Sequence, residues 1–287
     1  MGVASELVLY AGCLAGTPFP KYVACAAESG FDAVTVWPLM YRRAISREGL
    51  DPATMRRILD DSGVRVTDLD ACGSWLPPVE RPAGEEVPAM FRSVWSRWDF
   101  FEAAEVLGAD TIVAVDLEGG RARSDGSFKD ATVEGFAQLC DDAAQHGLRV
   151  ALEFMPFSRI TDLAAGWTVV DRAGRANGGL VIDTCHLARG GWDPDLLASI
   201  PADRVFALQV SDAASVAPED LQDESVYHRV CPGEGGLDLA SMLAVLAGMG
   251  VSTRVGPELY RSGWSDRPPA EVARDLAAAT RALLAGR

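Results

Sequence analysis

Short apolar segments alternate with longer helical segments along the whole chain, and this rhythm limits the possible folds most strongly. Five predicted helices are followed by a glycine before the next apolar segment, at Gly30, Gly63, Gly108, Gly147 and Gly250. Apolar runs bounded by turn residues predict strands at 7–10, 33–37, 64–69, 111–115, 149–154, 180–182, 205–210 and 253–258. Helical spacing and end signals predict helices at 19–30, 52–63, 89–108, 131–147, 161–173, 194–200, 237–250 and 269–285.

Each predicted strand is followed by a helix, which is the connection that parallel strands need. The chain is therefore predicted to form an α/β protein, a (β/α)8 TIM barrel. A doubly wound open sheet has the same alternation, but eight units in about 250 residues fit a closed barrel better. No GxGxxG motif opens a helix, so a dinucleotide site has no support.

Composition and charge exclude several classes of protein. The 287 residues are 48% hydrophobic and contain no Pro/Gly/Ser-rich linker, which predicts one domain over 1–287. A formal charge of −15 would repel nucleic acid. No apolar run reaches membrane-spanning length, and the first residues lack the basic flank of a secretory signal. The six cysteines form no CxxC pair, which indicates free thiols and a cytoplasmic location.

Four polar residues stand where four consecutive predicted strands end: Glu153, Asp183, Gln209 and Glu258. In a parallel barrel these positions lie on one rim and face one cavity. Three neighbouring carboxylates stay ionised at neutral pH only if a cation lies among them, so the pattern predicts a divalent metal. The alternative is that each group satisfies a backbone amide or an arginine at its own strand end.

The ligand types narrow the choice of metal. Three carboxylates and one amide oxygen form an all-oxygen set, which suits Mn²⁺ or Mg²⁺ better than Zn²⁺, because zinc sites are typically built from imidazole and thiolate.

Further residues near these strand ends are candidates for catalysis and substrate binding. His186 follows Asp183 by three residues and is close enough to reach a substrate, although a loop-holding role is the alternative. Arg229 is a candidate fork for a substrate carboxylate, phosphate or hydroxyl, or else a solvated loop cation. Asp212 is a candidate for orienting His186 or Arg229. Trp37 ends the second predicted strand and is a candidate wall of the pocket.

The second half of the chain, residues 149–260, resembles the xylose isomerase-like barrels of sugar phosphate isomerases and epimerases; the first half is similar only in rhythm. The resemblance lies in Glu153 after an apolar strand, Asp183-x-x-His186 followed by Gly190-Gly191, Gln209 with Asp212 three residues on, Arg229 before Pro232-Gly-Glu-Gly, and Glu258 at the last strand. It implies one divalent metal bound by the matches to Glu153, Asp183, Gln209 and Glu258, with both glutamates often serving as acid and base.

Some positions depart from this pattern. Many relatives carry histidine where Gln209 stands, whereas hydroxypyruvate-isomerase-like and some 3-dehydroshikimate-dehydratase-like members carry glutamine. The second predicted strand ends in Trp37 where a glutamate is common, so substrate contacts of the first half do not carry over. DNA-repair endonucleases of the superfamily need a histidine-rich zinc site, and three histidines with an acidic surface argue against that branch.

The predicted function is a metal-dependent isomerase or epimerase of a sugar or small hydroxy-carbonyl compound. The metal would stabilise the enediolate left after loss of the α proton, while Glu153 and Glu258 take and return that proton and His186 bonds the substrate oxygen. A dehydratase of the 3-dehydroshikimate type and a non-catalytic sugar-binding barrel are the alternatives. The sequence leaves open the substrate and whether the chain forms a homo-oligomer.

Overall fold

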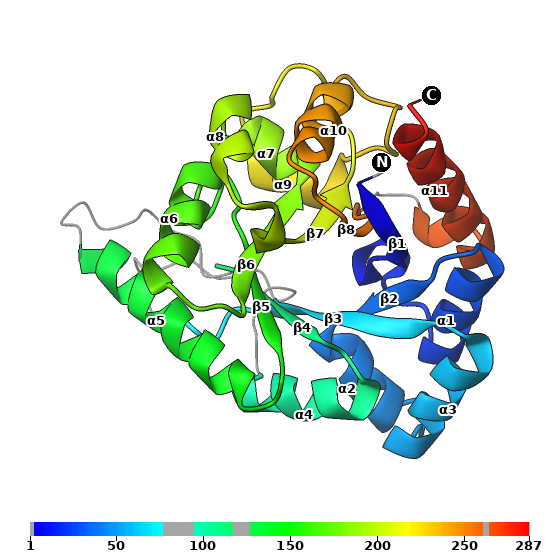
Figure 1. Ribbon diagram of the computed structural model, residues 1–287. Coiled ribbons are helices and arrows are strands. Elements are labelled where there is room, and N and C mark those ends of the chain that lie inside the picture. Colours follow the sequence, from blue (N-terminus) through cyan, green and yellow to red (C-terminus); the bar gives the residue numbers. More distant parts are fainter. Residues whose placement is uncertain (1–2, 77–94, 117–126, 261–263, 287) are drawn as a thin grey trace.

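Eight parallel strands form a closed barrel in the computed structural model, which describes residues 3–76, 95–116, 127–260 and 264–286 (Figure 1). The strands pair in chain order, and β8 closes the ring on β1. They are β1 Ala4–Leu9, β2 Ala33–Val36, β3 Arg65–Cys72, β4 Thr111–Ala114, β5 Arg149–Glu153, β6 Gly178–Asp183, β7 Val205–Val210 and β8 Thr253–Pro257. The predicted (β/α)8 TIM barrel is therefore confirmed, and the open sheet is excluded.

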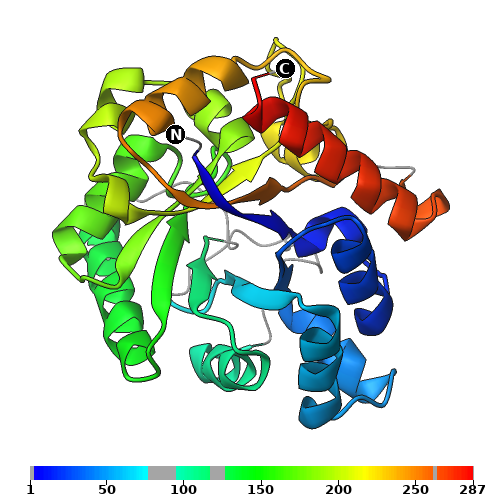
Figure 2. The same ribbon diagram turned by 45° about the vertical axis from the view of Figure 1, so that its right-hand side comes forward.

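Helices surround the strands on the outside of the barrel (Figure 2). They are α1 Phe19–Glu28, α2 Pro38–Ser46, α3 Pro52–Ser62, α4 Arg97–Leu107, α5 Ser127–Ala144, α6 Leu163–Ala173, α7 Thr184–Arg189, α8 Pro194–Ser199, α9 Leu221–Tyr227, α10 Leu239–Gly248 and α11 Pro269–Leu284. The predicted cap of α3 is present, since the Asp51 side chain accepts a hydrogen bond from Thr54 N at 2.7 Å. Gly63 then ends this helix in the left-handed conformation, at φ 69°.

Three helices, α2, α7 and α9, were not predicted. They have nine, six and seven residues, too few to repeat an apolar pattern over several turns. The helix predicted at 89–108 is present from Arg97 as α4, and its positions 89–94 lie outside the described residues.

The apolar core has two main layers that follow from the alternation along each strand. One layer packs the outer strand faces against the helices. The smaller layer faces the barrel interior and contains Val113, Val115, Ala151, Met155, Val181, Phe206 and Ala207. Ion pairs add polar contacts between the strands. Arg254 of β8 bonds Asp68 of β3 at 3.0 Å and Asp110, just before β4, at 2.7 Å.

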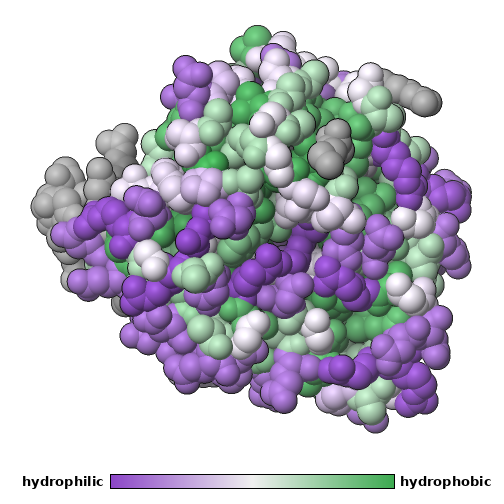
Figure 3. All heavy atoms as spheres, in the orientation of Figure 1, coloured by the Kyte–Doolittle hydropathy of each residue, from purple (hydrophilic) through white to green (hydrophobic). Residues whose placement is uncertain are grey.

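The surface and the thiols agree with the composition. Hydrophilic residues predominate in the lower half of the face shown in Figure 3, where Figure 1 draws α3, α4 and α5. All six cysteines are free and buried, as predicted. Among the described residues, no helix has the length and apolar character that crossing a membrane requires. The expectation of a single domain over 1–287 stays a prediction.

Candidate active site

Four predicted site residues lie at the carboxyl ends of consecutive strands. Glu153 and Asp183 end β5 and β6, Gln209 pairs in register with Asp183 from β7, and Glu258 follows β8 directly. Glu153, Asp183 and Gln209 stand two positions after the inward-facing residues Ala151, Val181 and Ala207, so they also face the interior. All four are at most 6% exposed.

The carboxyl groups are close enough to influence one another. Burial raises the pKa of Glu153 well above its usual value, and the charges of Asp70 and Asp183 raise it further. Burial likewise raises the pKa of Glu258, with the charges of Asp70, Glu153 and Asp183 adding to the effect. Their mutual repulsion supports the prediction that these strand ends meet around one cavity.

Asp183 differs from the two glutamates because it has strong partners. Its Oδ1 accepts the backbone N–H of His186 at 2.8 Å and so caps α7, while its Oδ2 lies 2.6 Å from Nη1 of Arg229. Burial alone would raise the pKa of Asp183, but Arg229, His186 and the backbone N–H outweigh burial and lower it. Asp183 is therefore the carboxylate of this site that is held ionised.

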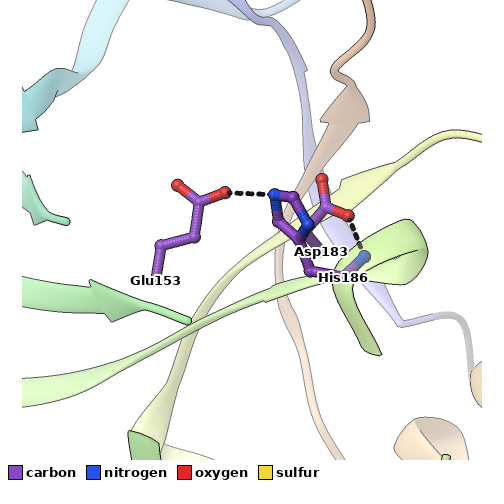
Figure 4. A group of neighbouring side chains, drawn as sticks. All are labelled: Glu153, Asp183 and His186. Atoms are coloured by element: carbon purple, nitrogen blue, oxygen red, sulfur yellow. Dashed lines mark hydrogen bonds and ion pairs between the residues drawn. The ribbon is translucent and has the colours of Figure 1, made fainter. Parts of the chain in front are cut away.

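His186 faces Glu153 in Figure 4, and its ring also contacts Arg229. Its Nε2 is 3.5 Å from Oε1 of Glu153 and 2.9 Å from Nη2 of Arg229. Burial lowers the pKa of His186 to about 3 despite the charge of Asp183, so the ring is neutral at pH 7. One donor atom from each of Glu153, Asp183 and His186 lies within 4.8 Å of the others. The sequence predicts that His186 reaches the substrate; in the structure it also belongs to a group of candidate metal ligands.

Gln209 provides the test of whether these residues fit a metal. Its side chain is fully buried, and neither its Oε1 nor its Nε2 has a hydrogen-bond partner among the described residues. A buried amide without partners is costly, so such groups usually face a ligand, an ion or a water molecule. An amide oxygen beside three carboxylates fits a divalent cation.

Arg229 is buried and heavily bonded, which contradicts its alternative interpretation as a solvated loop cation. Besides Asp183, its Nη1 donates to Ser211 Oγ at 3.3 Å and to the backbone oxygen of Glu258 at 3.1 Å. Its Nη2 lies 2.9 Å from Ser225 Oγ. These contacts make Arg229 an organiser of the site, and its role as a substrate fork stays a prediction.

Asp212 corrects one sequence-based hypothesis, because its carboxylate orients neither the His186 ring nor the Arg229 guanidinium. It accepts backbone N–H groups of the following loop at 2.8–3.1 Å, from Ala213, Gly233, Gly235 and Leu237. The backbone of Asp212 also exchanges two hydrogen bonds with Val230, the residue after Arg229. Its effect on Arg229 is therefore transmitted through the backbone.

The other wall of the site contains an aromatic pair and an acid that the sequence reasoning missed. Trp37 stacks on Tyr260 with ring centroids 5.5 Å apart and planes at 25°. Asp70, near the end of β3, is buried. Burial and the charge of Asp68 raise the pKa of Asp70 to about 7. The alternation of Asp68 and Asp70 was the available signal, but the predicted strand ended at residue 69.

A closed parallel barrel with buried acids at its strand ends defines the class of (β/α)8 proteins whose sites lie at the carboxyl end of the barrel. Within that class the chain belongs to the xylose isomerase-like TIM barrel family, whose model matches residues 23–283.

Two kinds of enzyme are among the relatives that match the chain in sequence. The chain is 26% identical over 256 residues to 3-dehydroshikimate dehydratase of Pseudomonas aeruginosa, a match covering 89% of this chain and 38% of that protein. It is 29% identical over 174 residues to inosose isomerase of Bacillus velezensis, covering 60% of this chain and 61% of that one. The chain therefore spans less than two thirds of either relative.

A similar solved structure is that of IolI protein with a bound zinc atom. It superposes with a TM-score of 0.84 at 20% identity and covers 98% of both chains. At this identity the likeness supports the fold alone.

Proposed function

We propose that the protein is a divalent-metal-dependent isomerase or epimerase of a sugar or small hydroxy-carbonyl compound, working through an enediolate. The observation that carries the proposal is the fully buried Gln209 amide, which has no partner among the described residues and stands in register with Asp183 on the neighbouring strand. The similarity to inosose isomerase supports the same class of reaction.

Glu153, Asp183, Gln209 and Glu258 would hold the cation. When bound, a divalent metal supplies Lewis acidity toward a substrate carbonyl and its neighbouring hydroxyl. We propose Mn²⁺ or Mg²⁺ because these four side chains offer oxygen atoms. His186 offers a nitrogen in the same group, and the zinc in the IolI structure makes Zn²⁺ the competitor to test.

The side chains have distinct roles in this proposal. One glutamate, Glu153 or Glu258, takes the α proton in its ionised form, and the other returns a proton to the neighbouring carbon or to the opposite face. Burial and neighbouring carboxyl groups raise the pKa of both glutamates, and a carboxyl group can either accept or donate a proton. Neutral His186 can hydrogen-bond the substrate oxygen that changes charge. Trp37 would form a wall of the substrate pocket. Arg229 would donate to a substrate group from Nε, which has no partner among the described residues, because Nη1 and Nη2 are already bonded.

A dehydratase is the second candidate, favoured by the match that covers 89% of this chain. In that reaction the enediolate would expel a β-hydroxyl group, and His186 would be the better candidate for the base. The product would then be lighter than the substrate by one water, whereas isomerisation conserves mass.

The test combines metal analysis with deuterium exchange. Protein stripped with a chelator is reloaded with Mn²⁺, Mg²⁺ or Zn²⁺ and incubated in D₂O with inosose, keto sugars, hydroxypyruvate and 3-dehydroshikimate. An isomerase incorporates deuterium without losing mass as water, and a dehydratase loses one water. The proposal would be refuted if the protein bound none of these metals. It would also be refuted if none of the substrates gained deuterium or lost water.

The proposed partner is a small molecule, with neither nucleic acid nor membrane involved. The net charge of −15 supports the exclusion of nucleic acid. Six free cysteines support a reducing compartment, and we propose the cytoplasm.

A further inference from the structure

The short helix α7 is bonded at both of its ends to the segment that follows β7. Its six residues are too few for a helix that is stable by its own hydrogen bonds. Its N-cap, Asp183, bonds Arg229. Its last residue, Arg189, bonds Glu224 of α9. We propose that Arg189 and Glu224 are a positioning pair, which holds α9 on α7 and so keeps the guanidinium of Arg229 in place. This inference rests on the proposed function for its catalytic meaning.

The contact between Arg189 and Glu224 is a two-pronged ion pair. Nε of Arg189 donates to Oε2 of Glu224 at 2.7 Å, and Nη2 donates to Oε1 at 2.6 Å. Nη2 also donates to the backbone oxygen of Ala214 at 2.6 Å. The two side chains are only 6% and 5% exposed. Because the planar guanidinium must align with both carboxylate oxygens at once, such a fork fixes the orientation of both partners.

The next residue of α9 connects this pair with the site. Ser225 follows Glu224 directly, and its Oγ accepts a hydrogen bond from Nη2 of Arg229 at 2.9 Å. Helix α9 ends at Tyr227, two residues before Arg229. A shift of α9 would therefore move both the serine that bonds the guanidinium and the backbone from which Arg229 extends.

Helix α9 depends on polar contacts for its position. Within the described part of the chain, none of its seven residues belongs to an apolar core cluster. The start of α7 has a further attachment, because Thr184 Oγ1 donates to Ser211 O at 2.8 Å and accepts from Ser211 N at 3.0 Å. Without the ion pair, α7 would thus remain attached to the end of β7, whereas α9 would lose its connection with the end of α7.

Arg229 also decides which nitrogen of His186 carries the proton. Arginine only donates, so Nε2 of His186, which lies 2.9 Å from Nη2 of Arg229, accepts this hydrogen bond. A neutral imidazole has a single N–H, and it therefore lies on Nδ1. Displacement of Arg229 would release Nε2 and let the ring exchange between its two tautomers. The tautomer of His186 thus reports on the position of Arg229 without any metal or substrate.

The experiment replaces both members of the pair by apolar residues, in R189M/E224L. Replacing a buried ion pair by apolar residues of similar volume is often neutral for stability, so the Tm of this variant is expected within about 5 °C of wild type. The matched control is R175M/D141L, before β6 at the amino end of the barrel. Arg175 forms the same fork with Asp141, at 2.6 and 2.9 Å, and also donates to a backbone oxygen, that of Ala173, at 2.8 Å.

The first measurement is the imidazole ¹⁵N spectrum in a chelator at pH 7. The chain has three histidines, and the signals that disappear in H186Q identify His186. Wild type and R175M/D141L should show a protonated Nδ1 and an unprotonated Nε2, whereas R189M/E224L should show the intermediate shifts of mixed tautomers. Unchanged His186 shifts in R189M/E224L would overturn the positioning role, whatever the reaction.

The second measurement is steady-state kinetics of the metal-loaded protein. R189M/E224L is expected to lose about 10–100-fold in kcat with a change in KM below about threefold, and R175M/D141L is expected to stay within about twofold of wild type. A wild-type kcat in R189M/E224L would show that the site does not need the pair. Absence of turnover by the wild-type protein would overturn the proposed function, and the ¹⁵N spectrum would then decide the positioning role by itself.

R189K separates geometry from charge and serves as the second variant should R189M/E224L fail to fold. Lysine keeps the positive charge but lacks the planar fork. R189K is therefore expected to show mixed tautomers of His186 and a loss of at least about fivefold in kcat. Wild-type ¹⁵N shifts together with a wild-type kcat in R189K would mean that the fork positions nothing in the site.

Discussion

Replacing Gln209 by leucine is expected to stabilise the metal-free protein and to weaken its response to metal. Leucine has a similar size and carries no polar atoms. The Gln209 amide is fully buried, with both polar atoms lacking a partner among the described residues. Burying an unpaired amide costs about 1–3 kcal/mol by mutational data, and Q209L removes this cost.

The size of the effect follows from the length of the chain. With 287 residues the entropy of unfolding is about 0.6 kcal/mol/K, so each kcal/mol shifts Tm by about 2 °C. Q209L in a chelator should therefore unfold about 2–6 °C above wild type. A ligand at 100 times its Kd stabilises by about 2.7 kcal/mol, so saturating Mn²⁺ should raise the wild-type Tm by about 5 °C and that of Q209L by much less.

The assay is calorimetric unfolding with chelator and with increasing Mn²⁺. Asn177 supplies the control, since its amide donates to Cys140 O at 2.8 Å and to Leu148 O at 3.0 Å. N177L should lower the free energy of unfolding by about 1–3 kcal/mol and keep the full response to Mn²⁺. If Q209L is less stable than wild type in the chelator, the unpaired Gln209 amide does not destabilise the protein. If the Tm of Q209L responds to Mn²⁺ as strongly as that of wild type, Gln209 is not a metal ligand.

Three further predictions concern other groups of the site. E153Q and E258Q should each lower turnover by about 10²–10⁴-fold while Tm in chelator does not fall, and near-wild-type rates in either would reassign the acid and base. R229A removes the buried partner of Asp183 and should cost about 3–5 kcal/mol in urea unfolding; a loss below about 1 kcal/mol would contradict the buried ion pair. Because the pKa of His186 falls from about 6.5 in the unfolded chain to about 3 in the folded one, the unfolded state binds the extra proton between these values. Stability should therefore fall by about 1.4 kcal/mol per pH unit below pH 6.5 relative to H186Q in chelator, and parallel curves would refute the buried neutral ring.

The fold was predictable because it depends on patterns within single segments. The run Val205–Val210 was predicted with the bounds that the structure has, since a strand buried on both faces is apolar throughout. Helix α7 was not predicted, because a side-chain contact and not an apolar pattern determines where it begins. Its start depends on the Asp183 carboxylate capping the N–H of His186, and the same aspartate had been interpreted only as a ligand.

The site could be predicted only for residues whose position is determined by the end of a strand. Register and alternation bring Asp183 and Gln209 side by side, which any parallel barrel of this order would do. The partners of Arg229 and Asp212 were not predictable, because they depend on how a loop returns from β7 across the barrel end. Asp70 was missed because β3 extends three residues beyond its predicted end.

Charge gives a reason for an amide at position 209. The described residues of this rim include four buried carboxyl groups, those of Asp70, Glu153, Asp183 and Glu258, whereas Arg229 is paired with Asp183 and His186 is neutral. The remaining carboxyl groups must hold protons or share a cation, because burial and mutual repulsion disfavour their charged forms. A fifth acid would add repulsion that one divalent ion could not offset. An amide offers the metal an oxygen without adding charge, so metal binding and proton exchange by the two glutamates can coexist in one cavity.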